Sequence, residues 1–149
     1  MLFLERLFSG LRPVVALIIL FGLAGCASLS TVAPGANSIP DEEAAILEID
    51  QSVKASVRPQ LNAIYDEYGS TVIPSESFKD YHRIKVAPGA YTVQLKVYSA
   101  GHYPAFPRIR IRARSGKTYL FTGNLIMDGR AVRAEYTEIP TPPAVETKQ

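Results

Sequence analysis

Hydrophobic and polar residues alternate with a period of two along much of the chain between residues 44 and 139. The clearest example is Arg108–Arg114, where isoleucine and alanine alternate with four arginines. This period puts successive side chains on opposite faces of a β-strand, so one face is buried and the other meets solvent. The other predicted strands are Ala44–Asp50, Leu61–Tyr68, Tyr81–Val86, Tyr91–Tyr98, Lys117–Thr122 and Ala131–Ile139. A helical turn is the alternative for Leu61–Tyr68.

Turn motifs separate these segments. Pro88-Gly89 has the order of a type II turn, because glycine accepts the positive φ that the third turn position needs. Ser115-Gly116 and Asp128-Gly129 lie between strand-like segments and predict hairpin turns. Short strands at this spacing predict an all-β fold, an antiparallel β-sandwich of about seven strands over residues 44–139.

The N-terminus has a different pattern. Arg6 and Arg12 precede Val14–Leu23, a run of ten residues without a charge. This run is shorter than the roughly 20 apolar residues that span a bilayer. An apolar run of this length behind a basic start is typical of a secretory signal peptide. The alternative is an uncleaved N-terminal anchor with an incidental buried cysteine.

The motif Leu23-Ala24-Gly25-Cys26 closes the apolar run and resembles the lipobox of bacterial lipoproteins. That resemblance implies a diacylglyceryl thioether on Cys26 and cleavage between Gly25 and Cys26, so that the signal helix, residues 1–25, is removed. The chemistry needs a thiol because sulfur is the nucleophile that takes the lipid. Cys26 is the only cysteine, so no disulfide framework is available. We expect no cofactor other than this covalent lipid.

The residue after the cysteine also matters under this resemblance. Ala27 is not the aspartate that retains lipoproteins at the inner membrane, which implies the periplasmic face of the outer membrane. Removal of residues 1–25 lowers Lys plus Arg from 16 to 14 and Asp plus Glu from 14 to 13, so the net charge falls from +2 to +1. A nearly neutral chain has no bulk attraction to nucleic acid. We therefore expect no nucleic acid as a partner. The lipid on Cys26 makes a membrane the expected partner.

Two segments flank the predicted β-domain. Residues 26–43 are rich in Ser, Thr, Pro and Gly, and such a composition cannot offset its ordering entropy. We predict a flexible tether there, which as a coil reaches about 20–25 Å on average. Residues 140–149 contain three prolines and predict a disordered tail.

The segment Val86–Val93 resembles the apolar-x-Pro-Gly-x-Tyr-x-Val hairpin of transthyretin-like sandwiches, which include PEGA and carboxypeptidase-regulatory-like domains. Ser115–Leu120 resembles the Ala-Gly-Lys-x-Tyr turn and strand of small bacterial lipoproteins with that fold. The resemblance covers roughly residues 81–122. It implies a transthyretin-like β-sandwich and no catalytic residues.

The sharpest candidate for a binding site is the row Arg108, Arg110, Arg112 and Arg114. In a strand these side chains share one face at intervals of about 6.5–7 Å. The planar guanidinium binds phosphate or carboxylate through two parallel hydrogen bonds, so the row is typical of an anion-binding face. The alternative is a solvated face whose arginines pair with Glu135 or Glu138.

Other candidate chemistry is sparse. The two histidines, His82 and His102, are too few for a zinc site, and we predict no metal site. The sequence has no phosphate-binding loop, nucleophile elbow or His-Glu-x-x-His motif. We therefore predict that the protein is not an enzyme. Aromatic residues around Tyr103 form a proline-rich loop with His102, which we interpret as a cap over the open end of the sandwich. A contact surface is the alternative.

Together these patterns predict a membrane-anchored, non-enzymatic interaction module of the cell envelope. Its partner would be another envelope protein or an anionic envelope component. The alternative is a structural accessory subunit that packs into a larger envelope assembly.

Overall fold

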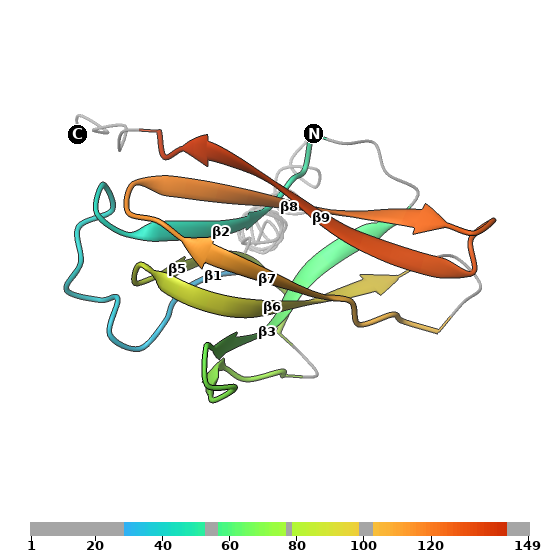
Figure 1. Ribbon diagram of the computed structural model, residues 1–149, viewed down its shortest axis with the longest axis horizontal. Helices are drawn as coiled ribbons and strands as arrows, with labels where there is room; N and C mark the ends of the chain where they lie inside the picture. The colour runs from blue at the N-terminus through green and yellow to red at the C-terminus, as the bar shows by residue number, and fades with distance from the viewer. Residues whose placement is uncertain (1–28, 53–56, 77–78, 99–102, 143–149) are drawn as a thin grey trace, which may run out of the picture.

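The computed structural model describes residues 29–52, 57–76, 79–98 and 103–142, which Figure 1 shows in colour. These residues form an all-β structure, as predicted, and no helix occurs among them. None of the described residues therefore lies in a helix that could cross a membrane. The strands are β1 (Leu29–Val32), β2 (Ala45–Ile49), β3 (Arg58–Asp66), β4 (Thr71–Ile73), β5 (Tyr81–Val86), β6 (Gly89–Tyr98), β7 (Arg108–Ala113), β8 (Lys117–Ile126) and β9 (Ala131–Pro140). The helical alternative for Leu61–Tyr68 is wrong, because β3 extends through it to Asp66.

The nine strands form one sheet. Its main path is β7-β6-β3-β5-β2-β8-β9, while β1 pairs with β5 and β4 pairs with β3. Two pairings, β1 with β5 and β2 with β8, are parallel. The predicted antiparallel order holds for the other pairings but is wrong for these two, and the sheet has nine strands rather than about seven. Parallel neighbours need a long connection rather than a hairpin, and the chain between β2 and β8 supplies one.

The sheet is rolled so that its inner surface encloses one core. β8 lies across the core from β6, since a Cβ at Gly123 would be 3.3 Å from the Val97 Cγ2 atom. Each large side chain buried there contributes about 1.5–3 kcal/mol. The largest fully buried side chains include Tyr119, Phe121, Ile46, Leu47, Leu61, Ile64, Ile84 and Leu95.

The N-terminal flank is ordered where the structure describes it. Residues 29–43 include β1, which pairs with β5, and the buried Ala33 and Ala36. The Lys85 Nζ atom lies 2.6 Å from Asp41 Oδ1, and this hydrogen bond holds the pKa of the carboxyl below its usual value. Pairing with β5 and burial of small side chains offset the ordering entropy. The prediction of a flexible tether is therefore wrong for residues 29–43.

The start of the predicted tail is also ordered. Pro140 ends β9, and the Thr141 N–H donates to the Gly116 carbonyl oxygen at 2.9 Å. The hydroxyls of Thr141 and Thr118 lie 3.1 Å apart. A disordered tail from residue 140 is thus wrong for Pro140 and Thr141, while residues 143–149 lie outside the described residues.

Of the two predicted hairpin turns, Asp128-Gly129 is confirmed, because it joins the paired strands β8 and β9. Ser115-Gly116 is a turn but not a hairpin, because β7 pairs with β6 whereas β8 pairs with β2 and β9. Gly116 and Gly129 have φ values of 64° and 85°, in the left-handed region that favours glycine. Gly89 lies outside that region and begins β6, so the type II turn is wrong. Tyr91 explains the difference, because its hydroxyl donates to the Ala87 carbonyl oxygen at 2.9 Å and its ring covers Gly89.

Candidate functional site

Three of the four predicted arginines lie on the outer face of β7. Arg108, Arg110 and Arg112 are exposed, while Ile111 and Ala113 between and beyond them are buried. This confirms the predicted alternation. β7 is also the last strand at one end of the sheet's main path, with β6 as its neighbour.

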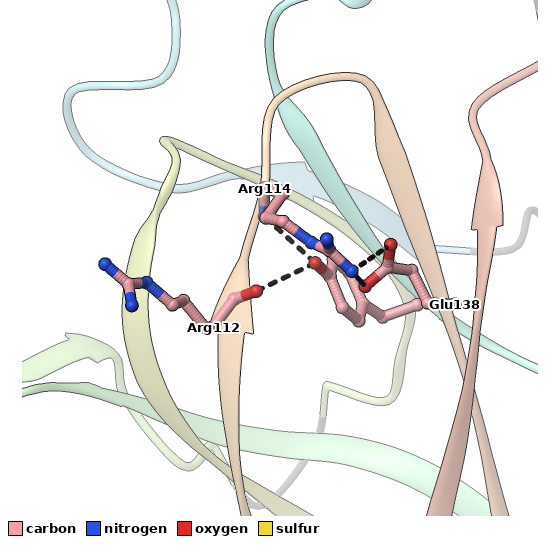
Figure 2. Close-up of polar contacts among 4 residues, drawn as sticks. Arg112, Arg114 and Glu138 are labelled. Atoms are coloured by element: carbon pink, nitrogen blue, oxygen red, sulfur yellow. Dashed lines mark hydrogen bonds and ion pairs between the residues drawn. The ribbon is translucent and has the colours of Figure 1, made fainter.

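Arg114 follows the end of β7 and is engaged. Its Nη2 lies 2.6 Å from both carboxylate oxygens of Glu138 on β9, which confirms one of the pairings expected for a solvated face. Its backbone N–H donates to the Tyr119 hydroxyl at 2.9 Å, and that hydroxyl donates to the Arg112 carbonyl oxygen at 2.8 Å. The hydrogen bond from Arg114 holds the pKa of Glu138 below its usual value. Figure 2 shows the Arg112 side chain pointing away from this cluster.

Arg108 is oriented by an aromatic ring. Its guanidinium carbon lies 5.1 Å from the ring centroid of Tyr65 on β3, a cation–π distance. Gln94, opposite Arg108 on β6, accepts hydrogen bonds from the Tyr65 hydroxyl at 3.4 Å and from Asn62 Nδ2 at 3.2 Å. Arg108 therefore leans back over the sheet.

Arg110 and Arg112 remain available for a ligand. Within the part of the chain that the structure describes, neither guanidinium has an ion-pair or hydrogen-bond partner. Their direct neighbours on β6 are Thr92 and Ala90, which carry no charge. Two guanidinium groups at a spacing of about 6.5–7 Å can each present a pair of parallel donors to phosphate or carboxylate.

Two open hollows adjoin this pair. One, of about 750 Å³, is bordered by Arg112, Arg114 and Glu67, and the other, of about 470 Å³, by Arg110 and Asp66. The Asp66 carboxylate is engaged, because its Oδ1 accepts the backbone N–H groups of Tyr68 and Ser70 at 2.9 and 2.8 Å. Glu67 borders both hollows and is exposed. The site thus offers two unpaired cations with one carboxylate at its rim.

The other residues predicted as functional sites do not form a site among the described residues. Gly25 and Cys26, the predicted cleavage and lipid sites, lie outside the described residues, as does His102. His82 lies on β5, with a buried Nδ1 that has no hydrogen-bond partner. Among the described residues, no group of three or more His, Cys, Asp or Glu is placed to hold a metal ion.

The aromatic loop does not act as a cap. Tyr103 is 97% exposed and Phe106 47% exposed, so these rings cover little of the core. Met127 at the tip of the β8–β9 hairpin is also 72% exposed. A hollow of about 390 Å³ lies between these two regions and is bordered by Val97 and Val132. The alternative interpretation as a contact surface fits this exposure better.

The sequence interpretation missed Tyr119 and Tyr65, the residues that distinguish one arginine from another. Both lie in predicted strands. Tyr65 meets Arg108 across more than 40 residues of chain, which a local pattern does not contain. Tyr119 lies only five and seven residues from Arg114 and Arg112, but alternation alone does not show where its hydroxyl points. No family model, curated protein or solved structure matches this chain. The resemblances to lipoproteins and to transthyretin-like domains therefore depend on the motifs quoted above.

Proposed function

We propose that this chain is a membrane-anchored lipoprotein of the cell envelope whose β-domain binds anionic groups through Arg110 and Arg112. One observation carries the binding proposal: these two exposed neighbours have no partner among the described residues, whereas Arg108 and Arg114 are engaged. Two open hollows border these arginines and leave room for a ligand beside them.

The chemistry of the site narrows the ligand class. Two guanidinium groups favour a ligand with a phosphate or two neighbouring carboxylates. The exposed carboxylate of Glu67 repels a dense polyanion, so it favours a ligand that also has a hydrogen-bond donor, such as an acidic glycan. Exposed charges are screened by salt within about 8–10 Å, so affinity should fall as ionic strength rises.

The anchoring proposal depends on Leu23–Cys26 and its position after an apolar run. Lipid on Cys26 would anchor the domain firmly, because each buried CH₂ contributes about 0.8 kcal/mol. Ala27 after the cysteine favours the periplasmic face of the outer membrane. We also propose that the rolled sheet is a variant of the transthyretin-like β-sandwich, in which the Tyr91–Ala87 hydrogen bond supports the Pro-Gly-x-Tyr motif. The function proposed is non-enzymatic.

A titration of the detergent-solubilised full chain with oligogalacturonate and with lipopolysaccharide tests the site. The double variant Arg110→Glu, Arg112→Glu should bind at least about tenfold more weakly, since each charge-assisted hydrogen bond contributes about 1.5–3 kcal/mol. Arg114→Gln is the comparison variant and should lose much less affinity than the double variant, because Glu138 already engages that arginine. Equal binding by wild type and the double variant would rule out this site.

Labelling with palmitate tests the anchor separately. Wild type should incorporate the label and fractionate with the outer membrane, whereas Cys26→Ser should do neither. Label in the Cys26→Ser protein, or wild type in the inner membrane, would contradict this part of the proposal without affecting the arginine site.

A structural accessory subunit is the second candidate. The exposed Tyr103 and Met127, with the hollow bordered by Val97 and Val132, favour it, because apolar surface is often covered by a partner. Chemical cross-linking in intact membranes distinguishes the two functions. A fixed assembly with another protein, unaffected by Arg110→Glu and Arg112→Glu, would favour the subunit.

A further inference from the structure

β9 is the last strand at the other end of the sheet's main path. Its ten residues pair with β8 on one side, and no described strand pairs with its other side. An unpaired strand edge is a template for another strand. β9 is therefore the place to look for a partner that adds to the sheet.

The hydrogen bond from the Thr141 N–H to Gly116 shows which backbone groups face outward. The pairing of β9 with β8 is uninterrupted from Lys117↔Pro140 to Ile126↔Ala131. Because backbone groups alternate along an antiparallel ladder, the odd-numbered residues of β9 face β8. The N–H and C=O groups of Val132, Ala134 and Tyr136 then face the open edge.

The charges of this segment are antisymmetric about Ala134. Arg133 and Arg130 lie one and four residues before it, and Glu135 and Glu138 lie one and four residues after it. A second copy of β9, antiparallel and related by a two-fold axis at Ala134, therefore places each arginine opposite a glutamate. Directly opposed residues of an antiparallel pair lie on the same face, where opposite charges attract.

Other registers lack this match. A two-fold axis at Arg133 or at Glu135 puts two like charges opposite each other, which is destabilising. An axis at Val132 or Tyr136 pairs no arginine with a glutamate. An axis between two residues would place an even-numbered residue opposite an odd-numbered one. Their side chains point to different faces of the sheet, whereas opposed residues of an antiparallel pair share one face. The charge pattern thus selects one arrangement.

The side chains are available for this contact. Arg133 and Glu135 are 63% and 49% exposed, and the Arg133 Nη1 and Glu135 Oε1 atoms are 4.0 Å apart, the longest ion pair among the described residues. The other carboxylate oxygen of Glu135 accepts a hydrogen bond from Asn124 Nδ2 at 2.9 Å, so Oε1 is the atom available to a partner. Glu138 already binds Arg114, so the contact between Arg133 and Glu135 of the partner subunit carries more of the attraction than the outer pair. The same arrangement puts Val132, beside the apolar hollow, opposite the partner's Tyr136, which is 40% exposed.

We propose that two copies of this chain associate through β9, antiparallel about a two-fold axis at Ala134, and so extend the sheet across both copies. The partner is a second copy rather than another protein because the strand's own charge sequence is complementary to itself. The proposal is independent of the anion site on β7.

Charge exchange tests the pairing on the detergent-solubilised full chain, with mass measured by sedimentation. Wild type should be a dimer, and Arg133→Glu or Glu135→Arg alone should weaken association at least tenfold, because each puts like charges together twice. An equimolar mixture of the two single variants should associate again, as should the double variant. Both residues are exposed, so the circular dichroism of all variants should match wild type.

Cysteine cross-linking in membranes tests the register. Opposed hydrogen-bonded residues have Cα atoms about 5.5 Å apart, within disulfide range, so Ala134→Cys should form a disulfide dimer. Thr137→Cys is the matched control, because its symmetry mate would be about 20 Å away along the strand. A monomeric wild type, single variants that still form dimers, or equal cross-linking of the two cysteine variants would overturn the proposal.

Discussion

The two edges of the sheet differ in how their backbone groups and charges are arranged. At the β7 edge, Tyr119 donates to the Arg112 carbonyl oxygen and accepts the Arg114 N–H, so part of the backbone edge is already satisfied. All charges on the outer face of β7 are positive. At the β9 edge, the charges are mixed and no described strand forms backbone pairs with it, although Arg114, which follows β7, binds Glu138 near its end.

The order of charges along an edge strand, and not only their number, therefore determines whether that strand can pair with a second copy. A second β7 would put arginine opposite arginine, which resists pairing, while leaving the guanidinium groups free for small anions. A second β9 would put arginine opposite glutamate. One edge is thus suited to a ligand and the other to a copy of the chain.

The largest expected effect comes from the residue that closes the β7 edge. Tyr119→Ala should lower the free energy of unfolding by about 3–5 kcal/mol, since a large aromatic side chain is lost from the core. Tyr119→Phe should lower it by about 1–3 kcal/mol, because the Arg112 carbonyl and the Arg114 N–H lose their partner. Urea denaturation measures both. In Tyr119→Phe, amide exchange at Arg114 should also become faster.

Tyr136→Phe is the control for this comparison. The centroid of its ring lies 5.7 Å from that of the Tyr119 ring. Tyr136 is nevertheless 40% exposed, and its hydroxyl has no hydrogen bond to the described residues. It should change stability by less than about 0.5 kcal/mol. If both phenylalanine variants behaved alike, the hydroxyl of Tyr119 would not be what closes the β7 edge.

The next effect separates the two sides of β9. Glu135→Pro removes an N–H that faces β8 and should lower the free energy of unfolding by about 1–3 kcal/mol. Ala134→Pro removes an N–H that faces the open edge, where proline is tolerated, so it should cost less stability and prevent dimer formation. Urea denaturation and sedimentation measure the two properties. The reverse order of destabilisation would show that the ladder faces the other way.

A smaller effect is expected on the outer face of β7. Arg110→Glu with Arg112→Glu should change the free energy of unfolding by no more than about 1 kcal/mol, the range of exposed ion pairs. A thermal melt beside the binding titration checks this. A large drop in the melting temperature would mean that these arginines are structural, and the loss of binding would then have a different explanation.

The smallest effect concerns the ion pair that joins the two edges. The pKa of Glu138 is lowered in the folded state by its hydrogen bond with Arg114, so its contribution is present above the unfolded pKa and is lost as pH falls through the folded value. Acidification below about pH 4.3, the ordinary glutamate value, should therefore weaken the contact between β7 and β9. Glu138→Gln should reduce that pH dependence in an amide-exchange titration. An unchanged profile would assign it to another carboxylate.

Much of the sheet was predictable, because alternation reports burial directly. The boundaries of Tyr81–Val86 agree with β5, and the row of arginines in β7 was placed on the correct face. The short β1 and β4 escaped notice, since three or four residues carry no reliable period. Parallel pairing of β1 with β5 depends on contacts across about 50 residues of chain, which a local pattern does not contain.

The candidate site was predictable only in outline. The sequence placed four equivalent arginines in one row, but Arg114 lies beyond the strand and reaches Glu138 on β9. Arg108 is held by Tyr65, which is two strands away. Which arginines stay free is decided by the rolling of the sheet, and this depends on the whole core rather than on the segment that carries them.

The early start of β1 has a further consequence for a chain anchored as proposed. Only Ala27 and Ser28 separate Cys26 from Leu29, so the extended link reaches about 10 Å. A domain on so short a link moves within a thin layer at the membrane surface, and its copies meet in two dimensions. Such confinement raises their effective concentration, so the membrane favours the pairing of β9 further than solution does.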